Sequence, residues 1–298
     1  MLNLLKKLEG ILPLSWRITL RNLYYMPKRM ENLENLLTTI LQQNYENTKS
    51  LDMQKCGFRI YSQNDEDGIL IYIFSKIGTT NKRFVEFGIG NGIEYNTANL
   101  SINLGWSGLL MDGDADGVKL AQNYYKRRLG LDFARIQIAQ HMLTAENINC
   151  VLLNHKVKDE IDLIIIDIDG IEYYVWEAVN VINPRVVVIE YNLYLGYKNA
   201  LTVKYDPEFN RFKEHSSGMY FGASLPALVK LARSKGYVLV HVNGINAFFV
   251  RKDIARDKLR EISVSEASQL GIHNISQLGI RNTPEAFERI QHLNFVYV

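Results

Sequence analysis

The sequence predicts an α/β fold in which helices cover both faces of a mostly parallel sheet. Segments of continuous apolar residues, typical of strands buried on both faces, alternate with segments whose apolar residues recur at helical spacing. Late in this pattern, two apolar runs flank Asn243-Gly244, a dipeptide that favours a hairpin turn. Together these features predict a Rossmann-like sheet with an antiparallel hairpin late in the chain.

The individual elements follow one another from residue 66 onward. The first helix is expected at 66–78, because its apolar residues share one face and Gly78 favours a stop. The segment IDLIIIDIDG is the most apolar strand and is therefore expected near the centre of the sheet. Strands are expected at residues 84–88, 107–114, 134–140, 161–170 and 185–192 and as a hairpin within 237–253, with further helices at 96–105, 118–130, 172–182 and 224–237.

An N-terminal helical extension is expected before this pattern, over residues 1–55. Met30, Leu33, Leu37 and Ile40 alternate at three- and four-residue spacing, as in a coiled coil. Two heptads are too few to define a coiled coil alone. The stripe therefore predicts a helix that packs against the main domain or forms a homodimer.

The chain is divided into three parts by these patterns. The helical extension is followed by the Rossmann-like domain at 56–253 and by a C-terminal appendage at 254–298, which contains QLGI twice and has no assigned role. The leucines of the first 16 residues could line one helical face, which would pack on the main domain, on a partner subunit or on a membrane surface.

Composition narrows the classes of partner. The formal net charge is +2, from 34 basic and 32 acidic residues, which predicts no strong attraction to nucleic acid. No apolar run reaches the roughly 18 residues of a membrane-spanning helix. Two cysteines form neither a disulfide framework nor a metal-ligand cluster, so a cytoplasmic location is expected.

A glycine-rich turn follows the first strand of the alternating pattern, in the stretch FVEFGIGNG. Ligands of open parallel sheets bind beyond the carboxyl ends of the strands, usually beside this first strand. Asp112 ends the next strand, where a carboxylate can accept hydrogen bonds from ribose hydroxyls. The turn and this acid together predict a nucleoside site.

The glycine spacing and a nearby acid indicate which nucleoside is favoured. Gly88, Gly90 and Gly92 alternate with other residues, whereas a dinucleotide fingerprint has its third glycine three residues after the second. Glu86, beside the turn, would repel phosphate and attract positive charge. S-adenosylmethionine carries a sulfonium and an amino group and no phosphate, so it is the favoured cofactor. An NAD-linked oxidoreductase is the alternative.

At this point the residues resemble a known family. E-x-G-x-G-x-G is motif I of the class I S-adenosylmethionine-dependent methyltransferases, whose sheet carries a reversed strand made by a late hairpin. Together with SQNDEDGILIYIF, GWSGLLMDGD, IDLIIIDIDGIEYYVWEAV and NAFFVRKD, the motif makes residues 60–253 similar to FkbM-type methyltransferases. This resemblance implies O-methylation of a saccharide or another small polar hydroxyl acceptor.

The resemblance also implies a set of cofactor-binding residues. The glycine turn would wrap the methionine portion and the ribose, and Asp112 would hold the ribose hydroxyls, with Asp114 as the alternative. The residues after the third strand would border the adenine. The segment before residue 66 would border the pocket, although its simpler role is to cap the following helix. The implied cofactor-binding residues are Gln63, Glu86, Gly88, Gly90, Gly92, Asp112, Gln140 and His141.

Four oxygen-bearing side chains end two neighbouring strands of the expected sheet. Asp167 and Asp169 lie at the end of the fourth strand, and Glu190 and Asn192 lie at the end of the fifth. Alternation places both members of each pair on one side of the sheet. One hypothesis is that the four hold Mg²⁺, which would bind a substrate hydroxyl. The other hypothesis is that they position the substrate, with Asp167 or Glu190 as general base. A purely structural alternative is that Asp169 only caps the next helix.

Methyl transfer from a sulfonium requires alignment of the nucleophile and a base for its proton. Asp167 is one candidate base and His215 is another, because it lies in a polar segment after the fifth strand that commonly covers the substrate in this fold. The prediction is an S-adenosylmethionine-dependent methyltransferase that acts on a small molecule. A third hypothesis is a binding or assembly protein that keeps this fold without its chemistry.

Overall fold

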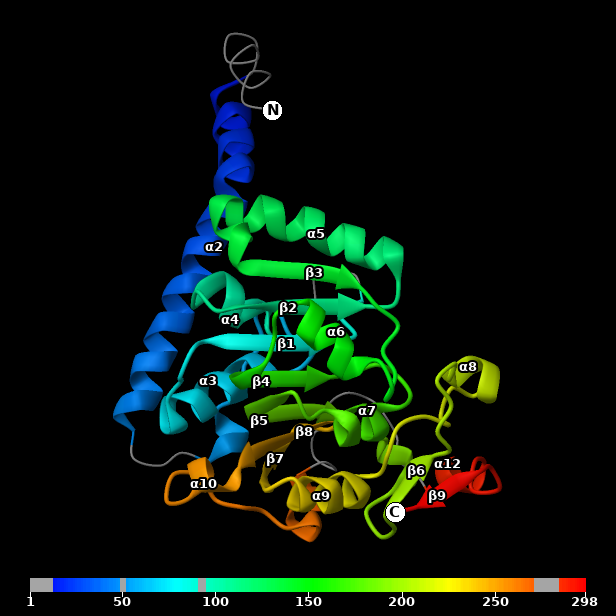
Figure 1. Cartoon of the computed structure of the whole chain (residues 1–298). Coiled ribbons are helices and arrows are strands. Elements are labelled where there is room, and N and C mark those ends of the chain that lie inside the picture. Colours follow the sequence, from blue (N-terminus) through cyan, green and yellow to red (C-terminus); the bar gives the residue numbers. More distant parts are fainter. Residues whose placement is uncertain (1–12, 49–51, 91–94, 271–283) are drawn as a thin grey trace.

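The computed structural model describes residues 13–48, 52–90, 95–270 and 284–298 (Figure 1). Its centre is a seven-stranded sheet in the order β3-β2-β1-β4-β5-β8-β7, in which β1 to β5 run parallel and β8 is antiparallel to both neighbours. This arrangement confirms the predicted Rossmann-like, mostly parallel sheet with a late antiparallel hairpin. The strands are β1 (Arg83–Phe87), β2 (Ser107–Asp112), β3 (Ile136–Gln140), β4 (Asp159–Ile166), β5 (Ile182–Glu190), β7 (Tyr237–Val242) and β8 (Asn246–Arg251).

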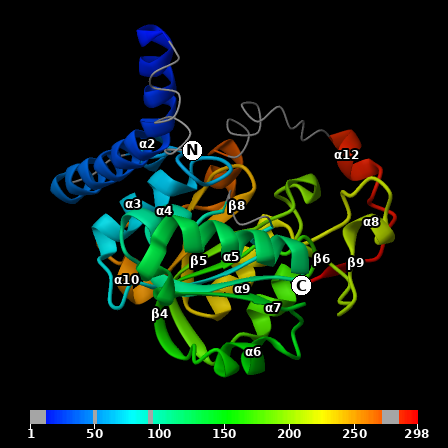
Figure 2. The ribbon, with the colours of Figure 1, turned by 90° about the horizontal axis from the view of Figure 1, so that it is seen from above.

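Helices cover both faces of this sheet (Figures 1 and 2). Along β1, Val85 and Phe87 are buried on the face covered by α6, α7 and α9, while Phe84 is buried on the face covered by α3, α4 and α5. Both faces are therefore apolar, as the continuous apolar strands predicted. These helices are α3 (Glu66–Ile77), α4 (Ala98–Asn103), α5 (Ala115–Leu129), α6 (Ile148–Asn154), α7 (Glu172–Ala178) and α9 (Leu225–Ser234).

The predicted N-terminal extension forms one long helix, α2 (Leu14–Asn47), which contacts α3 and α4. Tyr45 anchors its end, because its ring meets that of Tyr72 edge-on at 5.6 Å and its hydroxyl donates to the Cys56 carbonyl at 2.9 Å. The main domain does not cover the stripe predicted from the sequence. Its four members, Met30, Leu33, Leu37 and Ile40, are 47–57% exposed.

The C-terminal appendage is anchored to the main domain at its last strand. β9 (Phe295–Tyr297) pairs antiparallel with β6 (Leu201–Val203), a strand inserted after β5. Residues 1–12 and the second QLGI copy lie outside the described residues. Within the part of the chain that is described, none of the helices has the length and apolarity needed to cross a membrane. The remaining elements are η1 (Met53–Lys55), η2 (Gly130–Arg135), η3 (Leu193–Leu195), α8 (Arg211–Glu214), α10 (Lys252–Ala255) and α12 (Pro284–Glu288).

Candidate functional site

A cavity of about 640 Å³ lies at the carboxyl ends of β1, β2, β4 and β5. This is the edge of a parallel sheet where ligands are expected to bind, since the chain turns there between each strand and the next helix. The cavity brings together most of the side chains and glycines predicted from the sequence. The predicted residues that line it are Gln63, Gly88, Gly90, Asp112, His141, Asp167, Asp169 and Glu190.

The glycine turn after β1 is required by the close approach of two strand ends. Gly88 has φ +80°, and a Cβ built there would lie 1.4 Å from the carbonyl oxygen of Asp167 at the end of β4. A larger residue would therefore force β1 and β4 apart. Gly90 also has positive φ, +51°, but no atom lies within 4 Å of its added Cβ. Gly92, the third predicted glycine, lies outside the described residues.

The carboxylate of Asp112 is held in place by backbone donors. Gly90 N–H donates to its Oδ2 at 2.7 Å, and Asp114 N–H donates to its Oδ1 at 2.8 Å. Asp114 itself caps α5, because its carboxylate accepts from the backbone N–H groups of Asp116 and Gly117. Both acids line the cavity. Asp112 thus has a fixed orientation with lone pairs left to accept hydrogen bonds from a ligand.

Glu86 lies behind the glycine turn, and it is not among the residues that line the cavity. Its buried carboxylate accepts from Asn96 N–H at 2.8 Å and from the N–H and hydroxyl of Thr97 at 2.9 and 2.5 Å. Burial raises the pKa of Glu86 to about 7. The structure therefore places Glu86 as a support for the chain entering α4. The sequence prediction had put it in contact with the cofactor.

Two of the three remaining predicted cofactor residues line the cavity. Gln63 sits in a loop held by the carboxylate of Asp67, which accepts from three successive backbone N–H groups at residues 60–62. His141 Nε2 lies 2.9 Å from His155 Nε2. Gln140 is turned to the Gly113 carbonyl, to which it donates at 3.2 Å, and does not line the cavity.

Asp167 and Glu190 form a hydrogen-bonded pair of carboxyl groups inside the cavity. Burial raises the pKa of both groups, and the charge of neighbouring carboxylates raises it further. The shared hydrogen bond favours the proton on Glu190, which then donates to Asp167. The other oxygen of Glu190, Oε2, is buried and has no partner among the described residues. Such an orphaned oxygen in a cavity is a candidate contact for a ligand.

The structure does not assemble the predicted magnesium site. Asn192 is buried away from the cavity, where it donates to the Met219 and Phe221 carbonyls at 2.8 Å and caps η3. Asp169, with φ +58°, forms an ion pair with Arg211. Asp167 and Glu190 bind each other, so the four side chains do not converge on one point. Among the described residues, no group of three or more histidine, cysteine, aspartate or glutamate side chains is placed to hold a metal ion.

Sequence reasoning missed two contributors from the segment that follows β6. Phe209 packs its ring over Gly170, and Arg211 reaches Asp169, so both help to enclose the cavity. The predicted base in this region, His215, does not line the cavity, and its Nδ1 lies 2.7 Å from the Ser217 hydroxyl. The segment after the fifth strand does cover the site, but through these two residues and Pro207.

A third contributor, Glu172, shapes the turn after β4. Its buried carboxylate accepts from Ile168 N–H at 3.1 Å and from Gly170 N–H at 2.7 Å. This fixes the turn that carries Asp167 and Asp169. Burial raises the pKa of Glu172, and nearby Asp167 raises it further. The sequence did contain a signal for this role, because Glu172 comes two residues after Asp169-Gly170, where an acid is favoured in the first turn of a helix.

Comparisons with known proteins give similarity in structure only. No family model and no curated protein matches the chain. The N-terminal domain of EvdMO1, solved with SAH and D-fucose, aligns with 65% of this chain and 89% of its own at 12% identity and a TM-score of 0.41. The methyltransferase domain of bacterial CtHen1 aligns over 61% and 95% of the two chains at 13% identity and a TM-score of 0.38. Magnesium protoporphyrin IX methyltransferase from Synechocystis PCC 6803, with bound SAM, aligns over 62% and 77% at 10% identity and a TM-score of 0.37. At these values, only the geometry of the cavity indicates what it can bind.

Proposed function

We propose that the protein is an S-adenosylmethionine-dependent methyltransferase. The observation that carries this proposal is the charge of the cavity at the switch point of the sheet. Among the described residues, five carboxyl side chains line it, from Asp112, Asp114, Asp167, Asp169 and Glu190, against one guanidinium, that of Arg211. That guanidinium is already paired with Asp169. Such a cavity favours a nucleoside that carries positive charge, as the sulfonium and amino groups of S-adenosylmethionine do.

The same charge disfavours a dinucleotide cofactor. A pyrophosphate would lie among carboxylates and would require a helix N-terminus or free cations close by. A Rossmann-like fold binds pyrophosphate at the start of the helix that follows β1, which here is α4. The backbone N–H groups of Asn96 and Thr97, at the start of this helix, already donate to the Glu86 carboxylate. An NAD-linked oxidoreductase is therefore less well supported than a methyltransferase.

In the proposed complex, each wall of the cavity has a separate task. Asp112 accepts hydrogen bonds from the ribose hydroxyls, while the Gly88 turn allows the ligand to approach the backbone. His141 borders the adenine. These tasks place the sulfonium towards the ends of β4 and β5, where Asp167 and Glu190 lie.

The carboxyl pair provides the proton acceptor for an oxygen nucleophile. The acceptor hydroxyl gives its proton to the Asp167 carboxylate as its oxygen bonds to the methyl carbon, and the carbon–sulfur bond breaks to leave S-adenosylhomocysteine. Glu190 stabilises Asp167 by donating its own proton throughout. Phe209 offers an apolar ring face to an acceptor. A saccharide or another small polar hydroxyl compound fits this combination, and no step passes through a metal ion.

The proposal is tested by isothermal titration of S-adenosylmethionine into the wild-type protein and into Asp112→Asn. The wild type is expected to bind without added Mg²⁺. The variant loses a charged acceptor, worth about 1.5–3 kcal/mol, and is expected to bind about 10- to 100-fold more weakly. Asp132→Asn, at an exposed position in η2, serves as the control and should bind like the wild type.

Failure to bind S-adenosylmethionine, together with binding of NADH, would overturn the proposal in favour of the oxidoreductase. Transfer of a labelled methyl group to a panel of monosaccharides and small hydroxylated compounds then tests the acceptor class. If S-adenosylmethionine binds but no acceptor of any class is methylated, the binding-protein hypothesis is favoured over the enzyme.

A further inference from the structure

Helix α2 carries a continuous apolar strip that faces away from the rest of the molecule. Two series of residues repeat every seven positions, 16, 23, 30 and 37 and, three residues later, 19, 26, 33 and 40. We call these eight residues the α2 seam: Trp16, Thr19, Leu23, Met26, Met30, Leu33, Leu37 and Ile40. The seven apolar members are 47–62% exposed, and Thr19 is exposed as well.

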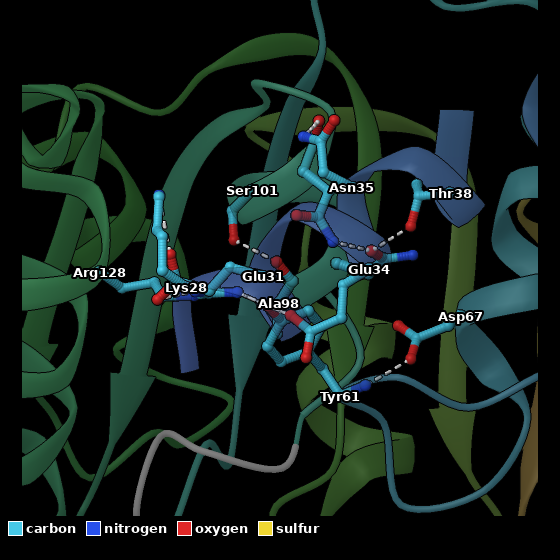
Figure 3. A network of polar contacts seen from close by, with 12 residues as sticks. Lys28, Glu31, Glu34, Asn35, Thr38, Tyr61, Asp67, Ala98, Ser101 and Arg128 are labelled. Carbon is cyan, nitrogen blue, oxygen red and sulfur yellow. Dashed lines mark hydrogen bonds and ion pairs between the residues drawn. The ribbon is translucent and has the colours of Figure 1, made fainter. Parts of the chain in front are cut away.

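The opposite side of α2, which meets the main domain, is largely polar. Figure 3 shows Glu31 and Glu34 reaching Arg128. The hydroxyl of Thr38 donates to Asn99 at 3.0 Å in a buried contact. A helix that packs on one domain alone normally buries its apolar side and exposes its polar side. α2 does the reverse over these turns. Its apolar side is therefore available to a partner other than its own domain.

The N-terminal part of α2 extends beyond the main domain (Figure 1). The hydrogen bonds and ring contacts described for residues 13–27 stay within the helix, namely Thr19 to the Ser15 carbonyl and Tyr24 against Tyr25. A helix of roughly 12–15 residues without tertiary contacts is only marginally stable in water. The exposed Trp16, at 62%, adds an apolar surface that favours burial. This arm is expected to be stabilised by a partner.

We propose that the partner is a second copy of this chain, with the two α2 seams packed as an antiparallel pair. Apolar residues at a seven-residue repeat favour a helix as the partner, because the facing side chains interdigitate. Two copies present the same seam, which a two-fold axis brings together. Pro27 lies outside the seam positions, but a proline inside a helix removes one backbone hydrogen bond and bends the helix, and Figure 2 shows the N-terminal part of α2 turned away from the rest. The seam is therefore expected to pack in two segments, one before and one after this residue.

The charges of α2 favour the antiparallel arrangement. By sequence, four basic residues between 17 and 29 precede three acidic residues between 31 and 46. A second helix laid antiparallel places its basic half along the acidic half of the first. Glu31 and Glu34 are already paired with Arg128, so these charges contribute modestly and the apolar seam contributes most. With a net charge of +1 over α2, attraction to an anionic membrane is weak.

Sedimentation equilibrium across a range of concentrations tests this dimer. The wild type is expected to reach twice the 34.3 kDa mass of the chain, while Leu33→Asp/Leu37→Asp is expected to stay at the mass of one chain. Leu131→Asp, which replaces a 97% exposed leucine outside α2, is the matched control and should remain dimeric. Thermal unfolding of the double variant checks that its main domain is folded.

A wild type that stays at the mass of one chain at every concentration overturns the proposal. So does a folded double variant that is as dimeric as the control, because the interface then lies elsewhere. Flotation with anionic phospholipid vesicles gives the remaining contrast. If the wild type has the mass of one chain and floats with the vesicles, and the double variant does not float, the seam binds a membrane surface and not a second copy.

Discussion

The two walls of the cavity are built in different ways. The strand wall, made by Gly88, Gly90 and Asp112, is held by contacts between neighbouring strand ends. Gly90 N–H donates to the Asp112 carboxylate, and Gly88 lies too close to the Asp167 carbonyl to carry a side chain. The segment wall, made by Phe209 and Arg211 with Pro207, is held by side chains that depend on distant parts of the chain. The first wall follows from local sequence and sheet register. The second requires the completed tertiary structure.

The segment wall depends on contacts with the last strand, β9. Tyr220 packs against Phe209 with ring centroids 6.0 Å apart and against Phe295 in β9 at 4.8 Å. Its hydroxyl donates to the Asn294 carbonyl at 2.8 Å. The β6–β9 pair therefore supports the side of the cavity to which we assign the acceptor. Under the proposed function, the strand wall would hold the cofactor and a separately supported wall would hold the acceptor.

Gly88→Ala should give the largest effect, because it breaks the strand wall itself. The added Cβ would lie 1.4 Å from the Asp167 carbonyl oxygen, at a residue with φ +80°. We expect a loss of about 3–5 kcal/mol in the free energy of unfolding and loss of S-adenosylmethionine binding. Gly90→Ala is the matched control in the same turn. Its Cβ meets no atom within 4 Å, so only the positive φ, worth about 1–2 kcal/mol, should count. Equal losses in the two variants would refute the close-approach argument.

The pH dependence of stability tests the support behind the strand wall. The pKa of Glu86 rises from 4.5 to about 7 on burial. Between these values the unfolded chain ionises at Glu86 while the folded chain stays protonated, so raising the pH favours unfolding. The stability contributed by the protonated group is present below pH 4.5 and is lost as the pH rises through about 7. In Glu86→Gln, chemical denaturation from pH 4 to 8 should show a shallower fall than in the wild type.

A surface variant in the other wall controls for general charge effects. Glu208→Gln lies in the exposed part of the segment that carries Phe209, and its stability should follow the wild-type pH profile. If Glu86→Gln also follows the wild-type profile, burial of Glu86 does not raise its pKa as described. The absolute stability of Glu86→Gln should fall at low pH, because an amide matches the three donors around Glu86 less well than a carboxyl group does.

The sequence could predict the sheet and the strand wall because their determinants are local. Alternation of apolar strands with helices, the Asn243-Gly244 turn and the spacing from the glycine turn to Asp112 each act over short distances. The error at Asn192 has a physical cause. β5 ends at Glu190, so the strand alternation assumed for Asn192 no longer applies there, and Asn192 caps η3 instead.

The orientation of Glu86 could have been predicted, and that of Arg211 could not. Glu86 lies between Val85 and Phe87 in β1, so alternation turns it with Phe84 towards α3 and α4, away from the strand end. Arg211, in contrast, forms its ion pair with a residue 42 positions earlier in the chain. No periodicity or motif around Arg211 indicates that contact, since it depends on how the segment after β6 folds over the cavity.

Tyr220→Phe should give the smallest effect, and it tests whether the segment wall can be loosened without a change in the strand wall. It removes the hydrogen bond to the Asn294 carbonyl but keeps the ring packed on Phe295, at a cost of about 1 kcal/mol. Hydrogen exchange should therefore become faster in residues 201–222 and 295–297 and stay unchanged in 83–90, with S-adenosylmethionine affinity unaltered. Tyr297→Phe, at a ring 74% exposed, is the control and should change neither region. Faster exchange in 83–90, or weaker cofactor binding, would show that the two walls are coupled and that the C-terminal strand supports the whole cavity.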